Sequence, residues 1–274
     1  GGEALDNFQT MTRFLPMGTG DDWLRFNGIG ERVTWGMNNN RNPTEAQKAE
    51  FVRIGLWAAR RGMSLTMHWP ENDSVHHLLE AFERINREVA IGPLRWSVAH
   101  LHDATPASLR RIEALGVGWL MQNRHYFAGS RQIIALGDRV RRTPPLRTAI
   151  DTGMRIGAGT DAHRVMDFSP FVALRWMLDG LTVEGVSTRG PAEKPSREQA
   201  LKLYTQGSAW FAHDENRRGT LAPGRLADLA VLSADYFSVP VHEIGRIESS
   251  LTMVGGKIVH AAPPFRGPQS MSPK

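Results

Sequence analysis

Cysteine is absent from this 274-residue sequence, which excludes disulfide bonds and thiolate metal ligands. Any bound metal must therefore be held by His, Asp, Glu or a modified Lys. No stretch approaches the roughly 20 uninterrupted apolar residues that span a bilayer. The first ten residues, GGEALDNFQT, also lack the basic and apolar regions of a targeting signal. We therefore expect no membrane partner, and the compartment, cytoplasmic or periplasmic, stays open.

A basic-aromatic motif for nucleic-acid recognition is also missing, although the formal net charge is +5. The arginines are scattered along segments with helical periodicity, with a denser run at Arg139, Arg141 and Arg142. We interpret them as solvated helix faces rather than a nucleic-acid surface. Hydrophobic residues make up 41% and charged residues 22%, values typical of a soluble globular protein.

Short apolar segments alternate with segments of helical periodicity along most of the chain. Strands that are apolar on both faces and separated by helices are typical of parallel strands joined by crossover helices. The sequence therefore predicts an α/β fold. The predicted strands are 24–31, 63–68, 95–100, 117–122 and 155–161, and the predicted helices between them are 44–61, 73–89, 105–116 and 145–152.

Two architectures fit this alternation, a doubly wound sheet and a (β/α)8 barrel of the TIM type. No glycine-rich G-x-G-x-x-G loop follows any predicted strand. Polar residues end the strands instead, and catalytic groups collect at that rim in barrel enzymes. These observations favour a partial barrel. The strand-ending polar residues are Glu31, His68, His100, Gln122 and Asp161.

The composition changes after a helix that begins at Ser196, where Ser196 and Gln199 form a capping box. A Pro-Gly turn, an apolar strand and a hairpin around Gly255 and Gly256 follow, so we expect a small separate β-structure. The predicted domains are a partial barrel over 1–215, a small β-structure over 216–262 and a loose tail over 263–274.

Three residues of metal-binding type share one position, because His68, His100 and Asp161 each end a predicted strand. The strand ends of a barrel converge on one mouth, where two imidazoles and a carboxylate can bind a divalent cation such as zinc and activate water. A single strand-end histidine is more often structural. The spacing alone therefore leaves a metal site and structural histidines as equal alternatives.

Several motifs together resemble the second half of a member of the amidohydrolase superfamily. They are GAGTDAH at 157–163, the helix from Ser196, GTLAPGRLADLAVL at 219–232 and VGGKIVH at 254–260. The 219–232 segment is the most specific, because in that superfamily it marks the return of the chain to a small β-sandwich beside the barrel. The MHW and VAHLHDAT segments resemble the branch that includes N-substituted formamide deformylases. The resemblance covers about residues 20–261.

The resemblance implies barrel strands four to eight here, with the C-terminal β-structure as part of a composite β-sandwich. His68 on strand five and His100 on strand six would be metal ligands. Asp161 on strand eight would bind the metal and act as general base, passing its proton to the leaving nitrogen. The implied activity is hydrolysis of a C–N bond in an amide, formamide or cyclic amide.

Two departures from the superfamily pattern concern the metal ligands. No H-x-H motif precedes residue 68, so we expect the first three strands to be missing, and we interpret His102 in AHLH as a neighbour of the site. Gly30 occupies the position of the metal-bridging Lys of many relatives. Glu31 then either supplies a carboxylate ligand or pairs on the surface with Arg32 or Arg25. A single metal is therefore an alternative to a bridged pair.

Five further residues follow strand ends and are candidates for substrate contact, although loop packing is the alternative interpretation of each. They are Trp35, Trp69, Gln122, His125 and His163. A small molecule is the expected substrate. An incomplete barrel exposes strand edges, so we also expect a second copy, or the missing N-terminal half, as a partner, and no turnover by this chain alone. Deamination of a heterocycle and a non-catalytic binding or assembly module are the alternative functions.

Overall fold

The computed structural model describes residues 3–163 and 165–266. It divides into two compact units. The first comprises the described residues up to Gln122 together with Leu136–Gly157, and the second comprises Asn123–Ala135 and the described residues from Ala158 onward. No helix in the described ranges combines the length and the apolar character needed to cross a membrane.

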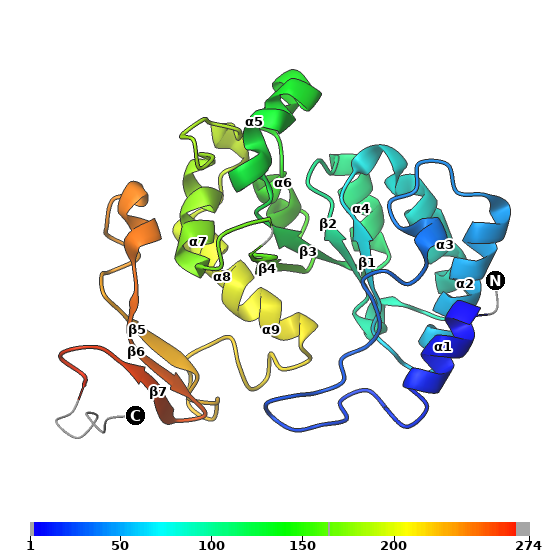
Figure 1. Cartoon of the computed structure of the whole chain (residues 1–274), viewed down its shortest axis with the longest axis horizontal. Helices are drawn as coiled ribbons and strands as arrows, with labels where there is room; N and C mark the ends of the chain where they lie inside the picture. Colours follow the sequence, from blue (N-terminus) through cyan, green and yellow to red (C-terminus); the bar gives the residue numbers. More distant parts are fainter. Residues whose placement is uncertain (1–2, 164, 267–274) are drawn as a thin grey trace. The chain divides into compact units, whose positions relative to one another are not determined.

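A parallel sheet has the strand order β1-β2-β3-β4 (Figure 1), and β1, β2, β3 and the first two residues of β4 belong to the first unit. In the register of the first three strands, Met67 pairs with Val98 and Val98 pairs with Trp119. The strands are β1 (Thr66–Trp69), β2 (Ser97–His100), β3 (Gly118–Gln122) and β4 (Ile156–Gly159). The α/β class and these four predicted strands are therefore confirmed.

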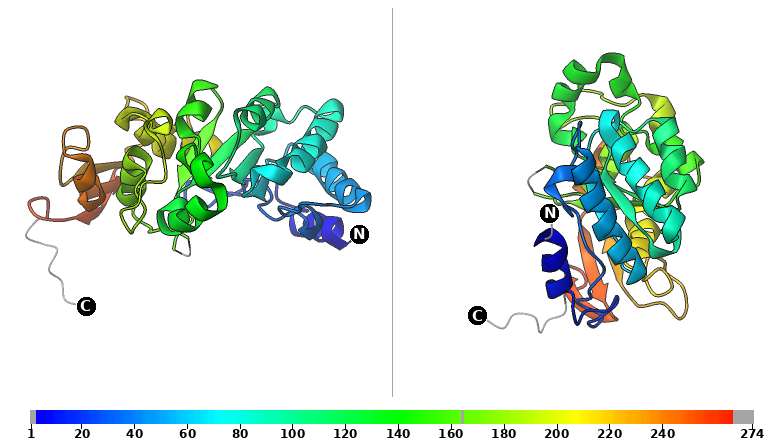
Figure 2. Two further views of the ribbon diagram at one scale, coloured as in Figure 1. Left: turned by 90° about the horizontal axis from the view of Figure 1, so that it is seen from above. Right: turned by 90° about the vertical axis from the view of Figure 1, so that its right-hand side faces the viewer.

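Three helices of this unit pack side by side in chain order, with α2 against α3 and α3 against α4 (Figure 2). Phe51 of α2, Phe82 of α3 and Trp96, which directly precedes β2, form a buried aromatic cluster. The rings of Phe51 and Phe82 lie 6.1 Å apart, and those of Phe82 and Trp96 lie 5.3 Å apart. The buried Trp96 indole donates to the Met63 carbonyl oxygen at 2.9 Å, so its polar atom is satisfied.

Four helices of the first unit, α2, α3, α4 and α6, agree with the predicted segments, whereas α1 was not predicted, and α2 carries the capping box of Thr44 and Gln47. The bounds of the helices in this unit follow. They are α1 (Glu3–Met11), α2 (Glu45–Arg60), α3 (Val75–Glu88), α4 (Pro106–Ala114) and α6 (Leu146–Asp151), with the short helices η1 (Trp35–Met37), η2 (Asn72–Ser74), η3 (Gly92–Leu94) and η4 (Gly137–Arg141).

The predicted strand 24–31 is wrong as a regular strand. The segment forms only two isolated bridges, Arg25 antiparallel to Gly20 and Ile29 parallel to Leu65. Gly28 and Gly30 have φ angles of 117° and 138°, and a Cβ on either residue would collide with the carbonyl oxygen of Ser64 or Thr66. The two glycines let the chain approach β1 closely but interrupt the extended conformation, so the segment runs beside the strand without becoming one.

The second unit contains an antiparallel sheet of order β5-β6-β7, which confirms the predicted hairpin around Gly255 and Gly256. The helix at Ser196 also begins with the predicted capping box. The elements are α5 (His125–Leu136), α7 (Pro170–Asp179), η5 (Pro191–Glu193), α8 (Arg197–Lys202), the π-helix η6 (Leu203–Gly207), α9 (Ser208–Phe211), η7 (Val241–Arg246), β5 (Leu229–Leu232), β6 (Ser249–Val254) and β7 (Lys257–Ala261).

Candidate metal centre

The carboxyl ends of β1 and β2 bring two imidazoles together in the first unit. His68 lies near the end of β1 and pairs in register with Ala99, while His100 is the last residue of β2. The backbone N–H of His68 donates to the Glu31 carbonyl oxygen at 2.9 Å, which aligns the glycine-interrupted segment with β1. The neighbouring strands and this backbone hydrogen bond therefore carry Glu31, His68 and His100 to one place.

Each carboxylate oxygen of Glu31 faces a different imidazole. Glu31 Oε1 lies 3.3 Å from His68 Nδ1, and Glu31 Oε2 lies 3.2 Å from His100 Nε2. The two rings are 4.4 Å apart at an interplanar angle of 71°. One ligand atom from each of the three residues falls within 4.8 Å of the others, which makes them a candidate metal-binding group.

The environment of this group becomes more buried from Glu31 to His100. The side chain of Glu31 is 41% exposed, that of His68 is 20% exposed and that of His100 is 7% exposed. Burial lowers the pKa of His68 below its ordinary value, and the neighbouring His100 acts in the same direction, while Glu31 opposes both. The lowered pKa favours the neutral imidazole, which is the form that binds a metal ion.

The chain turns sharply directly after His100. His100 and Leu101 have φ angles of 75° and 38°, a region that residues with a Cβ seldom adopt. Backbone hydrogen bonds hold this turn against the end of β1, from Leu101 N to the Trp69 oxygen at 2.9 Å and from His102 N to the Pro70 oxygen at 3.1 Å. The positive φ angles fall at a candidate ligand, where backbone strain commonly accompanies function.

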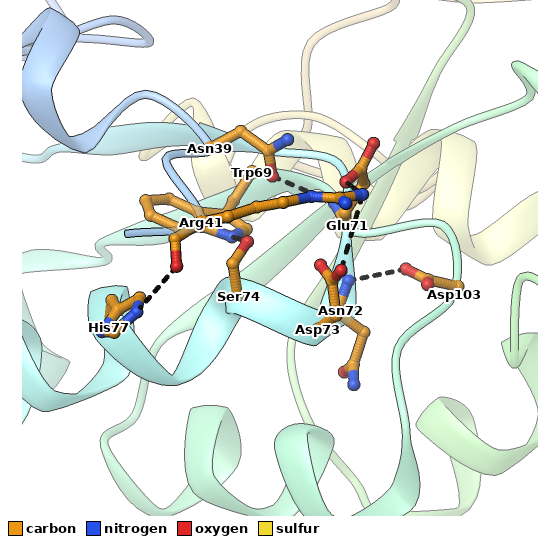
Figure 3. Close-up of polar contacts among 9 residues, drawn as sticks. All are labelled: Asn39, Arg41, Trp69, Glu71, Asn72, Asp73, Ser74, His77 and Asp103. Carbon is orange, nitrogen blue, oxygen red and sulfur yellow. Dashed lines mark hydrogen bonds and ion pairs between the residues drawn. The ribbon is translucent and has the colours of Figure 1, made fainter. Parts of the chain in front are cut away.

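A polar network joins the loops that follow β1 and β2 (Figure 3). The backbone N–H of Asn72 donates to Asp103 Oδ1 at 2.7 Å, and the Asn72 side-chain oxygen accepts the backbone N–H of Thr105 at 3.1 Å. Burial raises the pKa of Asp103, although the hydrogen bond from Asn72 acts in the opposite direction. The reciprocal pair fixes these two loops relative to each other beside the candidate ligands.

Arg41 extends the same network from the loop that follows η1 (Figure 3). Its guanidinium lies 2.7 Å from Glu71 and 3.5 Å from Asp73, and its carbonyl oxygen lies 3.1 Å from His77 Nε2. Neither Arg41 nor Asn72 was a candidate from the sequence. Their only sequence signal was the Asn and Asp content of the loops, which is common to many turns.

Comparisons with known proteins decide the family. Residues 1–260 match the model of the Amidohydrolase family. The chain belongs to this family. It is also 24% identical over 214 residues to the N-substituted formamide deformylase of Arthrobacter pascens, covering 76% of this chain and 39% of that protein. The predicted superfamily resemblance is therefore confirmed, and the chain spans less than half the length of this curated relative.

Solved structures share the fold of this amidohydrolase chain. A metal-dependent hydrolase of unknown function from Pyrococcus horikoshii OT3 has a TM-score of 0.66 at 20% identity, over 88% of this chain and 50% of that one. An adenosine deaminase from Xanthomonas campestris, with bound zinc, has a TM-score of 0.57 at 19% identity, over 78% of this chain and 49% of that one. This chain therefore spans about half of each structure.

The substrate residues predicted in the first unit differ in exposure. Trp35 is 76% exposed, and the Arg32 guanidinium lies 5.5 Å from its ring centroid. Gln122 ends β3, and its buried Oε1 has no hydrogen-bond partner among the described residues. The side chain of Trp69 is 0% exposed and its indole donates to Ser74 Oγ at 3.2 Å, so this ring packs under the loop that follows β1, and its contact with substrate stays a prediction.

The remaining predicted site residues belong to the second unit. Asp161 follows β4 by two residues and has a φ angle of 54°, and His163 is exposed. His125 is the first residue of α5 and is 1% exposed, and its contact with substrate stays a prediction. The helix that begins at His125 turns its first imidazole inward.

The second unit also contains a polar pair, Asn123 and Tyr204, that the sequence analysis did not predict. The fully buried Asn123 follows β3 and donates to the Tyr204 hydroxyl at 3.5 Å. Burial raises the pKa of Tyr204, which lies in the π-helix. Regular α-helical periodicity does not reveal a π-helix, because the wider turn moves Tyr204 out of the expected face.

Proposed function

We propose that this chain binds a divalent metal ion, such as zinc, through Glu31, His68 and His100 and serves in the hydrolysis of a C–N bond. The observation that carries this proposal is the grouping of the three ligand atoms within 4.8 Å at the carboxyl ends of adjacent parallel strands. Amide, formamide and cyclic amide bonds are the substrates that we propose.

The donor set fits such an ion chemically. Two imidazole nitrogens and one carboxylate match the three protein ligands of many catalytic zinc sites, which leave a position for water or substrate. Burial keeps His68 neutral and ready to bind, while Glu31 brings negative charge that offsets the charge of the cation. The proposal assigns one metal ion to this trio, with Glu31 in place of a carboxylated Lys.

A bound cation would activate a water molecule and polarise the scissile carbonyl group. The proposed role of Asp161 is to bind the metal as well and to act as general base, as the family resemblance implies. Its carboxylate would take a proton from the attacking water and give it to the leaving nitrogen. The proposed substrate contacts all lie at or after the end of a strand or strand-like segment. They are Trp35, Trp69, Gln122, His125 and His163.

We also propose a specific architecture for the chain. We propose that residues 1–215 form strands four to eight of a (β/α)8 barrel, that 216–262 form part of a β-sandwich and that 263–274 form a tail. The 263–274 segment lies mostly outside the described residues. Fold similarity to metal-dependent hydrolases supports a barrel. The proposed partner is a second copy of the chain or an N-terminal half that supplies the other strands.

Deamination of a heterocycle is the second candidate activity. It is supported by the fold similarity to a zinc-bound adenosine deaminase, whereas amide hydrolysis is supported by the sequence similarity to a formamide deformylase. Parallel assays with N-substituted formamides and with nucleosides, on the chain with and without its proposed partner, distinguish them. Deamination of nucleosides without hydrolysis of formamides would contradict the amide proposal.

Metal analysis tests the site itself. We expect the purified chain to bind one zinc ion per molecule after dialysis against zinc, as measured by atomic emission. His68→Ala and His100→Ala should each lose this ion. His76→Ala is the matched control, because His76 is an exposed histidine on α3, away from the trio. Equal zinc content in all four proteins would exclude the proposed ligands, and no zinc in any of them would favour a non-catalytic module.

A further inference from the structure

A pocket lies within the second unit, and none of its lining residues belongs to the metal-binding trio. It has a volume of about 370 Å³. It is built on the first two turns of α5, with one residue from each of two later segments, Val165 and Glu184. A cavity of this size is at the lower end of the range found for small-molecule sites, about 300–1,000 Å³.

Two arginines give this pocket its chemistry. Arg124 precedes α5 by one residue and Arg131 lies two turns further along, so the two residues line the pocket from the same side of the helix. No ion pair joins either guanidinium to a carboxylate within residues 3–163 and 165–266. Arginine presents paired N–H groups in a plane that matches the two oxygens of a carboxylate.

The other residues that line the pocket favour a carboxylate over a phosphate as the bound anion. Glu184 contributes one negative charge and accepts a hydrogen bond from the Ser130 hydroxyl, so the two arginines leave a formal charge of +1. A single positive charge balances a monocarboxylate, whereas a phosphate with nearly two negative charges would remain partly unbalanced. Phe127, Ala128 and Val165 supply an apolar wall for the rest of the ligand.

The pocket is held by packing that leaves little freedom. Gly129 faces the methyl groups of Thr182 and Thr188, and the backbone N–H of Val183 donates to the Tyr126 carbonyl oxygen at 2.8 Å. These contacts fix α5 against the turn that carries Glu184. A rigid wall with two preplaced guanidiniums lowers the entropy cost of binding an anion.

We propose that this pocket binds the carboxylate of an organic acid that carries an apolar or aromatic group. The inference goes beyond the proposed function and does not depend on the metal. It adds a recognition site that begins two residues after β3, and β3 pairs with the strand that ends in His100.

Isothermal titration calorimetry with benzoate tests this site on the full chain treated with EDTA. We expect benzoate to bind, and the uncharged benzamide to bind at least tenfold more weakly. The double variant Arg124→Gln/Arg131→Gln should weaken benzoate binding at least tenfold. The charge-matched control is Arg139→Gln/Arg141→Gln, which removes two exposed arginines outside the pocket and should leave the affinity unchanged.

The variant Glu184→Gln should change the affinity for benzoate in the opposite direction. It keeps an oxygen that accepts from Ser130 but raises the formal charge of the pocket from +1 to +2, so benzoate should bind more tightly. Circular dichroism verifies that each variant is folded. The proposal is overturned if benzoate does not bind, if benzamide binds equally well, or if both double variants have the same affinity. Loss of zinc binding with retained benzoate binding would reject the proposed function alone.

Discussion

Glu31 is the residue on which the candidate metal centre depends most. Its two oxygens face separate imidazoles at 3.3 and 3.2 Å, so a single carboxylate links both histidines. No other described Asp or Glu groups with His68 and His100 in this way. The side chain is therefore the natural source of negative charge for a cation bound by these two imidazoles.

Glu31→Gln should weaken zinc binding by at least tenfold, or about 1.4 kcal/mol. The amide has nearly the same shape but loses the charge that offsets the cation. Competition with a fluorescent zinc chelator measures the affinity. Glu45→Gln serves as the control, because Glu45 is an exposed residue that pairs with Lys48 at the start of α2. An unchanged affinity in Glu31→Gln would mean that Glu31 is not a ligand.

The lowered pKa of His68 predicts a pH dependence of the metal-free protein. The unfolded chain protonates this histidine near pH 6.5, whereas the folded chain does so only at lower pH. Between these two pKa values the unfolded state binds more protons, so stability falls as the pH falls below about 6.5. Urea unfolding at several pH values should show a smaller decrease for His68→Gln than for the wild type. Equal decreases in both proteins would contradict the lowered pKa.

At the residue scale, the sequence could predict that two side chains meet where their positions at strand ends were enough to bring them together. His68 and His100 could be paired because adjacent parallel strands end at the same edge of a sheet. The packing of Trp69 could not be predicted, since the side on which a strand-end ring packs depends on the following loop, here through Ser74. The hydrogen bond from the Asn72 backbone to Asp103 also had no distinguishing signal in the sequence.

At the scale of elements, the close contact between α5 and the turn at 181–188 depends on glycine at position 129. A Cβ on Gly129 would lie 2.7 Å from Thr188 Cγ2 and closer still to Thr182 Cγ2. Neither methyl group can move freely, because both threonines are buried. The helix therefore requires glycine at a position where alanine would be the better helix former.

Gly129→Ala should destabilise the protein by roughly 1–3 kcal/mol, despite a gain of about 1 kcal/mol in helix propensity. Chemical denaturation measures the change. Adding Thr182→Ser removes one of the two clashing methyl groups while keeping the hydroxyl that accepts from Val186 N, so the double variant should recover part of the loss. No loss in Gly129→Ala would show that α5 can shift at little cost.

The elements predicted most accurately were those with local signals at their ends. The predicted helix start at Thr44 and the predicted capping box at Ser196 agree with the starts of α2 and α8. By contrast, α5 was missed, because few of its residues are buried and its apolar residues do not form a clear helical face. The segment before Glu31 looked like a strand because its composition is apolar, but the φ angles of Gly28 and Gly30 are properties of a close backbone contact that no local pattern encodes.

At the scale of the whole molecule, the sequence predicted a parallel sheet followed by an antiparallel one, and both are present. The switch from β/α alternation to paired β-segments is a property of composition and periodicity, so it could be recognised in advance. The closure of a barrel could not, because it depends on strands beyond the four that pair here. All three proposed ligands of the trio belong to the first unit, and this distribution predicts where metal binding will act.

Zinc should therefore stabilise the chain through its first unit. At a free zinc concentration of about 100 times Kd, binding to the folded state alone contributes about 2.7 kcal/mol, which corresponds to a rise in Tm of roughly 5 °C or more. Differential scanning calorimetry measures this shift, and EDTA should reverse it. Hydrogen exchange should slow most in peptides that contain the ends of β1 and β2, and least in the β6–β7 hairpin. Only zinc bound at the strand ends would restrict the opening of β1 and β2. A Tm shift that persists in His100→Ala, or slower hydrogen exchange confined to the β6–β7 hairpin, would therefore place the zinc elsewhere.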